Sequence, residues 1–132
     1  MGFSYTKSSQ AKLLECDIRL QNIFNKAIEL IDVTILEGHR PKHLQDLAFA
    51  NGNSRVPWPK GKHNKVPSMA VDAAPCPIDW RNRERFVYFA GMILGIGAAQ
   101  GVKIRWGGSF DRDSDLGNDS FIDLPHFEID EP

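Results

Sequence analysis

The sequence has little of what marks several large classes of protein. Its two cysteines, Cys16 and Cys76, are too few for a disulfide-stabilised secreted scaffold, so we expect two reduced thiols. Its longest apolar stretch, residues 86–99, is interrupted by glycines and too short to span a bilayer. The N-terminus has no apolar run behind a basic cluster, so no export signal is expected.

An excess of charge of one sign is also missing. Sixteen Lys and Arg residues face seventeen Asp and Glu residues, for a net charge of −1, which argues against a uniformly basic nucleic-acid-binding protein. A hydrophobic share of 42% and a charged share of 25% are typical of a globular protein. The 132 residues are enough for one domain.

Hydrophobic spacing predicts alternating helices and strands. Apolar residues recur every three or four positions through residues 18–31 and 86–97, as on one face of a helix, with Asp17 and Asn82 as candidate N-caps. Residues 53–67 contain three prolines and no period, which predicts one long loop. We expect helices at residues 8–14 (beginning at Ser8 or Ser9), 17–31, 41–51 and 82–101, and strands at 33–36, 69–74, 102–106 and 125–129. This order favours an α+β fold.

Histidine is scarce, with four in the chain, so the search for a metal site is short. His63 precedes Asp72 by nine positions, and Asp72 lies in an apolar segment where a carboxylate needs a partner. His126 follows Asp123 by three positions. Two imidazoles and one carboxylate are ligands that zinc accepts, with a fourth position left for water, and Asp123 could accept a proton there. Spacing alone also fits surface histidines or buried, hydrogen-bonded ones.

A second histidine pair, His39 and His43, lacks the glutamate of the HExxH motif, and Pro41 keeps His39 outside the following helix. Arg40, between them, carries a planar guanidinium that suits a substrate carboxylate or a developing oxyanion; an ordinary surface cation is equally consistent.

Two charged segments allow further interpretations. The acidic loop at Asp111, Asp113 and Asp115 resembles the first half of an EF-hand but lacks the glutamate at its twelfth position, so calcium binding stays open. Residues 55–65 carry four cations and no acid, either as a solvated face or as a rim that holds substrate carboxylates: Arg55, Lys60, Lys62 and Lys65.

Several segments resemble one known family in the family's order. They resemble phage endolysins of the D-alanyl-D-alanine carboxypeptidase and L-alanyl-D-glutamate peptidase family. The segments are Glu37–Arg40, Lys62–Pro75, Pro77–Trp80, Ile104–Gly108 and Asp123–Glu128. Two departures occur: Gly61 stands where many relatives have serine, and the first histidine and the aspartate are nine positions apart instead of the commoner seven.

The resemblance implies roles for individual residues. It makes His63, Asp72 and His126 the zinc ligands, Asp123 the general base and Arg40 the cation that binds substrate or the transition state. It also implies a compact α+β domain of the type shared with hedgehog signalling domains, with a zinc cleft on one face of a small antiparallel sheet flanked by helices. Glu128 lies outside the ligand set, and we expect it to orient an imidazole or a lysine.

The function implied is zinc-dependent hydrolysis of peptidoglycan stem peptides at the L-alanyl-D-glutamate bond. Residues 1–132 would form a single peptidase domain with no separate wall-binding domain, acting as a monomer without nucleic acid or membrane insertion. A phage endolysin of this kind is made in the host cytoplasm and reaches the wall after the membrane is permeabilised. Two alternatives stay open: a D,D-carboxypeptidase or dipeptidase acting on terminal D-alanines, and an inactive zinc-stabilised wall-binding module.

Overall fold

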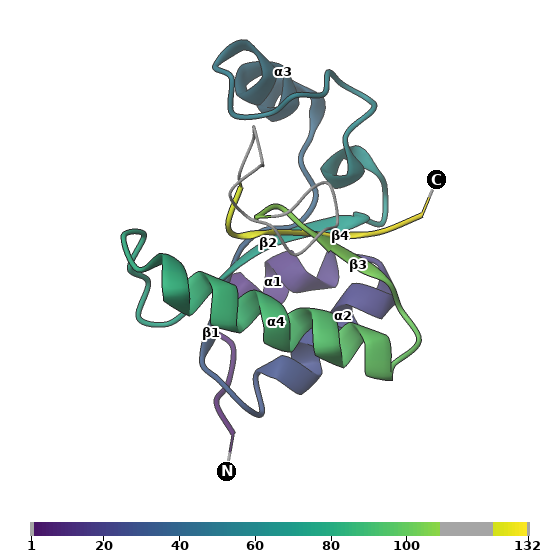
Figure 1. Ribbon diagram of the computed structural model, residues 1–132. Helices are drawn as coiled ribbons and strands as arrows, with labels where there is room; N and C mark the ends of the chain where they lie inside the picture. The colour runs from purple at the N-terminus through teal and green to yellow at the C-terminus, as the bar shows by residue number, and fades with distance from the viewer. Residues whose placement is uncertain (1, 109–122, 132) are drawn as a thin grey trace.

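The computed structural model describes residues 2–108 and 123–131 (Figure 1). The described elements, in chain order, are α1 (Lys7–Leu14), α2 (Ile18–Ala27), β1 (Val33–Glu37), α3 (Lys42–Ala50), the short 3-10 helix η1 (Lys62–Asn64), β2 (Ala70–Pro75), α4 (Arg83–Ala99), β3 (Ile104–Trp106) and β4 (His126–Ile129). The predicted helices and strands are confirmed with small changes of boundary. The largest change is in α2, which ends at Ala27 because residues 28–30 form a turn.

The helix starts follow the capping chemistry of the sequence. Asp17 and Asn82 cap α2 and α4, as predicted, because each side chain accepts a hydrogen bond from the first helical turn. The start predicted for α1 at Ser8 or Ser9 is wrong. Thr6 is the N-cap, and its side chain accepts from the backbone N–H of Ser9 at 3.1 Å. The side chain of Ser9 is buried instead and binds the backbone of β1.

The four strands form one antiparallel sheet in the order β1-β2-β4-β3. The two central strands are far apart in sequence, and their register places Asp72 opposite His126. On the other side of β4, Arg105 lies opposite Glu128. The predicted α+β architecture with a small antiparallel sheet is confirmed.

One face of the sheet is the apolar core, and α1, α2 and α4 lie on that side in Figure 1. Alternate residues of the central strands point into it, including Val71, Ala73, Phe127 and Ile129. The ring of Phe127 packs edge-on against Phe24 and Phe89, with ring centroids 5.9 and 5.8 Å apart. The intervening residues of the same strands therefore belong to the opposite face, towards η1 and α3.

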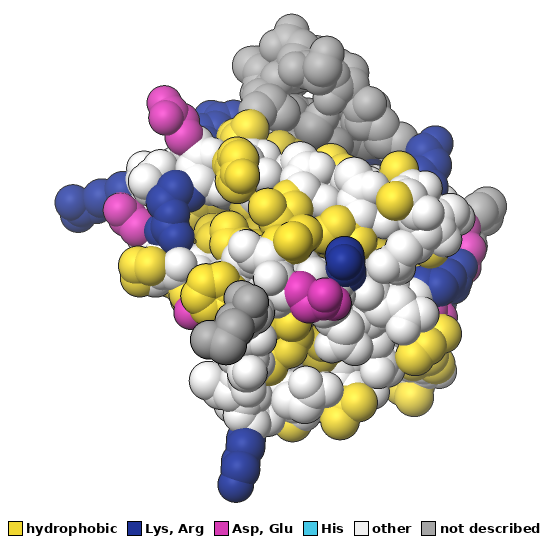
Figure 2. Space-filling model, turned by 90° about the horizontal axis from the view of Figure 1, so that it is seen from below, with side chains coloured by type: hydrophobic (Ala, Val, Ile, Leu, Met, Phe, Trp, Pro, Cys, Tyr) yellow, Lys and Arg dark blue, Asp and Glu magenta, His cyan; other side chains and the backbone are white. Residues whose placement is uncertain are grey.

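The outer surface beneath this helical layer is mixed in character. Figure 2 shows apolar side chains gathered near the middle of this face, with several Lys and Arg residues towards its edge and no histidine in view. No helix within the described ranges 2–108 and 123–131 is long and apolar enough to cross a membrane. Both cysteines are free thiols, as predicted.

Candidate metal centre

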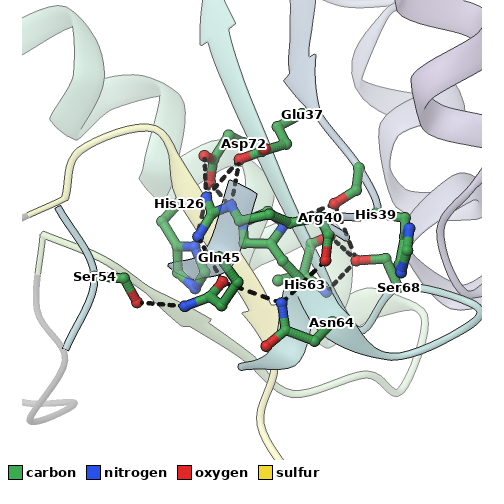
Figure 3. Close-up of polar contacts among 12 residues, drawn as sticks. Glu37, His39, Arg40, Gln45, Ser54, His63, Asn64, Ser68, Asp72 and His126 are labelled. Atoms are coloured by element: carbon green, nitrogen blue, oxygen red, sulfur yellow. Dashed lines mark hydrogen bonds and ion pairs between the residues drawn. The ribbon is translucent and has the colours of Figure 1, made fainter. Parts of the chain in front are cut away.

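Three candidate ligands from distant parts of the chain meet on the open face of the sheet (Figure 3). Nε2 of His63 lies 3.1 Å from Oδ1 of Asp72, and Nδ1 of His126 lies 3.2 Å from the same oxygen. One donor atom from each residue lies within 4.8 Å of the other two. The structure thus brings together the His-Asp-His set that the sequence suggested.

Two of these residues are placed by the sheet and one by a loop. Asp72 and His126 are paired residues of β2 and β4, so the strand register sets their separation. His63 lies in η1, inside the segment predicted as one irregular loop. Its backbone carbonyl accepts from the N–H of Arg40 at 2.8 Å, which ties η1 to the segment after β1.

The tautomer of His63 is set by a backbone carbonyl. Nδ1 of His63 lies 2.7 Å from the oxygen of Gly38, which can only accept. Nδ1 therefore carries a proton, and Nε2 is the ring nitrogen that faces Asp72 and is placed to bind a metal ion. A side chain at Gly38 would displace this carbonyl, because a Cβ there would lie 2.3 Å from the backbone oxygen of Lys12.

The tautomer of His126 is set by a carboxylate. Nε2 of His126 lies 2.7 Å from Oε1 of Glu128, so Nε2 donates and Nδ1 faces the other two ligands. Oε2 of Glu128 lies 3.8 Å from Nζ of Lys62 and 3.7 Å from a guanidinium nitrogen of Arg105. Burial opposes ionisation of Glu128, but His126, Lys62 and Arg105 lower its pKa. Glu128 thus contacts both an imidazole and a lysine, the two partners considered for it from sequence.

The donor set fits a zinc ion. Two imidazole nitrogens and one carboxylate oxygen are zinc ligands, and within the described part of the chain no fourth His, Cys, Asp or Glu joins the group. Despite burial, hydrogen bonds to Asp72 and Glu128 raise the pKa of His126 to about 9, while both histidines lower that of Asp72. A metal ion entering this group at neutral pH would therefore displace a proton.

Asp123 lies in the turn that leads into β4, beside the three candidate ligands. The backbone N–H of Asp123 donates to the carbonyl oxygen of Gly107 at 2.8 Å. Position 107 requires glycine, because a Cβ there would lie 2.0 Å from the carbonyl oxygen of Asp123. Burial and the charge of Asp72 raise the pKa of Asp123, and the nearby His126, His63 and Arg40 oppose this rise. A carboxyl group with a raised pKa in such surroundings suits proton transfer.

Arg40 completes the cluster and is not an exposed surface cation, since its side chain is 15% exposed. Nε donates to Glu37 at 3.1 Å, Nη1 donates to Gln45 at 3.1 Å, and Nη2 lies 3.8 Å from Oδ2 of Asp72. A break in the β1–β2 register places Glu37 opposite Asp72, so the partner of Arg40 comes from the sheet itself.

Comparison with known proteins identifies the family. The family model for phage L-alanyl-D-glutamate peptidases matches residues 1–129. The chain belongs to that family. A crystal structure of the L-Ala D-Glu endopeptidase ChiX of Serratia marcescens is similar in fold, with a TM-score of 0.75 at 20% identity over 96% of this chain and 90% of the other. No curated protein sequence matches the chain.

Several residues around the centre of this phage peptidase were not found from sequence. Gln45 and Asn64 lie buried beside Arg40 and His63, and no motif marks them. Glu37 has a weak signal, its position three residues before Arg40. Gly61 has a structural reason, because a Cβ there would lie 2.7 Å from Oδ1 of Asn64.

Three other hypotheses from the sequence concerned the basic rim, the second histidine pair and the acidic loop. Lys62 is not a rim cation of the peptidase, because Nζ binds the carbonyl oxygens of Ile129 and Glu131. Within the described ranges, His39 and His43 are not part of any metal-ligand group. The acidic loop considered for calcium lies at residues 109–122, outside the described residues.

Proposed function

We propose that this peptidase is a zinc-dependent L-alanyl-D-glutamate endopeptidase that cleaves peptidoglycan stem peptides as a phage endolysin. In this proposal residues 1–132 act as one monomeric catalytic domain. The proposal rests on the convergence of His63, Asp72 and His126. In each imidazole one nitrogen is hydrogen-bonded to an acceptor outside the group, so the other nitrogen is directed towards the metal position. The family and the name of the structural neighbour support the bond assigned.

The ligands proposed are Nε2 of His63, a carboxylate oxygen of Asp72 and Nδ1 of His126. Zinc held there would supply Lewis-acid activation of water and of the scissile carbonyl. Asp123 acts as general base: its carboxylate accepts the proton of the attacking water and then donates it to the leaving amine of D-glutamate. Its raised pKa favours the first step, because the carboxylate of a weaker acid is a stronger base towards the attacking water.

Arg40 supplies a fixed positive charge beside this group. Burial disfavours its charge, but the ion pair with Glu37 keeps the pKa of Arg40 raised, so the guanidinium is charged throughout. Charge develops on the carbonyl oxygen as water attacks. A guanidinium already oriented by Glu37 stabilises that charge without reorganising during the reaction.

The test combines metal analysis with product masses. Protein stripped by a chelator is reloaded with zinc, its metal content is measured, and each form is incubated with purified peptidoglycan. We expect one zinc per chain, and fragments that begin with D-glutamate in the zinc form only. Release of D-alanine alone would indicate a D,D-carboxypeptidase, and zinc binding without any new fragment would indicate an inactive module.

A further inference from the structure

Helix α3 is held to the protein by a polar residue. Gln45 is its one buried residue, with 1% of its surface exposed. The large apolar side chains of the helix face outward instead, with exposed fractions of 42% for Leu44, 57% for Leu47 and 47% for Phe49. Burial of a polar side chain is unfavourable unless its hydrogen bonds are made. The partners of Gln45 therefore indicate its role.

The amide of Gln45 makes all four hydrogen bonds open to it. Oε1 accepts from Nη1 of Arg40 at 3.1 Å and from Nδ2 of Asn64 at 3.0 Å. Nε2 donates to Oγ of Ser54 at 3.0 Å and to the carbonyl oxygen of Val56 at 2.7 Å. Figure 3 shows this amide between Ser54 on one side and Arg40 with Asn64 on the other.

The chemistry of the partners allows one orientation of this amide. A guanidinium can only donate, so the oxygen of Gln45 must face Arg40. A backbone carbonyl can only accept, so the nitrogen must face Val56. Reversing the amide would break both contacts. Gln45 thus joins the cation of the candidate site to the loop after α3 in one fixed geometry.

Gln45 binds the guanidinium nitrogen of Arg40 that Glu37 does not bind. Glu37 accepts from Nε and Nη2, and Gln45 accepts from Nη1. Asn64, next to the candidate ligand His63, donates to both the Gln45 oxygen and the backbone oxygen of Arg40. The guanidinium is therefore fixed along two edges, with Nη2 directed towards Asp72.

We propose that Gln45 is a positioning residue that sets the orientation of the Arg40 guanidinium beside the reacting carbonyl. This inference rests on the proposed function, in which Arg40 stabilises the oxyanion. It predicts that Gln45 affects the chemical step through Arg40, while Ser54, bound to the other end of the amide, does not.

Three variants separate the two ends of the amide. Gln45→Met keeps a similar side-chain volume and removes all four hydrogen bonds of the amide. Gln45→Glu keeps an acceptor for Arg40 and Asn64 but places a second carboxylate oxygen against the Val56 carbonyl. Ser54→Ala removes a loop contact only and is the matched control. Steady-state kinetics on a soluble muropeptide, with zinc content checked for each variant, gives kcat and KM separately.

We expect Gln45→Met to lower kcat about tenfold, with KM changed less than about twofold, because a displaced guanidinium stabilises the transition state less well. Gln45→Glu should recover most of kcat, and Ser54→Ala should stay within about twofold of the parent protein. In an Arg40→Lys background, Gln45→Met should have almost no further effect. Equal losses in both backgrounds, or equal losses in Gln45→Met and Ser54→Ala, would overturn the proposal.

A spectroscopic measurement tests the same proposal without turnover. In 15N-labelled metal-free protein, hindered rotation of the Arg40 guanidinium gives separate Nη signals, assigned by their loss in Arg40→Lys. We expect these signals to merge in Gln45→Met and to stay separate in Gln45→Glu and Ser54→Ala. Unchanged signals in Gln45→Met would refute the positioning role even if the parent protein proved inactive on peptidoglycan, which would refute only the proposed function.

Discussion

The two faces of strand β4 differ in what they contribute to the protein. Phe127 and Ile129 point into the apolar core, where Phe127 contacts two other phenylalanine rings. His126 and Glu128 point the other way, into a group of charged and polar side chains. Four consecutive residues thus alternate between the core and the candidate centre.

The difference shows how stability and chemistry are separated in a small domain. Burial of aromatic rings stabilises the fold, whereas buried ion pairs lose much of their Coulomb attraction to desolvation. The core face is therefore expected to contribute more to the free energy of folding than the polar face. The polar face is held in place by the core face of the same strands, and this comparison leads to four predictions.

The largest effect is expected on the polar face, from Asp123→Asn. Without the general base, kcat should fall about a thousandfold, since such groups contribute 10²–10⁴-fold. Zinc content and the free energy of unfolding should stay close to the parent values. Asp46→Asn, a change at an exposed carboxylate of α3, is the control. Loss of zinc in Asp123→Asn would make Asp123 a ligand instead.

The reverse pattern is expected on the core face, from Phe127→Ala. Removing this ring should lower the free energy of unfolding by about 3 kcal/mol, from lost burial and the cavity left behind. Urea denaturation measures the change, and Phe3→Ala, at a residue that is 53% exposed, is the control. A loss below about 1 kcal/mol would show that the two faces are not separated in this way.

An effect of intermediate size is expected from a change at Glu128, on the polar face of β4. Glu128→Ala should weaken zinc binding by about tenfold to a hundredfold, because His126 loses the acceptor that fixes its tautomer. Glu128→Gln can still accept from His126 and should lose less. Competition with a chromophoric chelator gives the affinities, with Glu131→Ala as control because Glu131 pairs with Arg19 outside the centre. Equal zinc affinities in Glu128→Ala and the parent would contradict this role.

The smallest effect is expected far from the centre, at the cap of α2. Asp17→Ala should lower the free energy of unfolding by about 1 kcal/mol at pH 7, and Asp17→Asn, which keeps the capping oxygen, by less. Hydrogen bonds from Arg19 lower the pKa of Asp17 in the folded protein. The stabilisation is therefore complete above the unfolded pKa of about 4 and is lost as the pH falls further. Denaturation between pH 7 and 2 measures it, and a constant difference would contradict the assignment.

Much of the fold could be predicted from local signals. The three-and-four spacing of Ile23, Phe24 and Ala27 identifies the buried face of α2, and Asp17 and Asn82 mark helix starts through their capping oxygens. The end of α2 could not be predicted, because the apolar spacing continues to Ile31 after the helix has ended. Thr6 was missed because serines that follow it are equally good capping residues.

The sequence by itself determined which side chains are available: two histidines, two aspartates and an arginine whose chemistry suits metal-assisted hydrolysis. It also determined most of the helices and strands, because the spacing of apolar residues is a property of each segment alone. Tertiary structure decided which atoms meet. The strand register places Asp72 against His126, the Gly38 carbonyl and Glu128 select opposite ring nitrogens, and a glutamine from an outward-facing helix orients Arg40. The contacts of Asp72 with His126 and of Gly38 with His63 join residues that are distant along the chain, so their geometry follows from the packing of the whole domain and has no local signal.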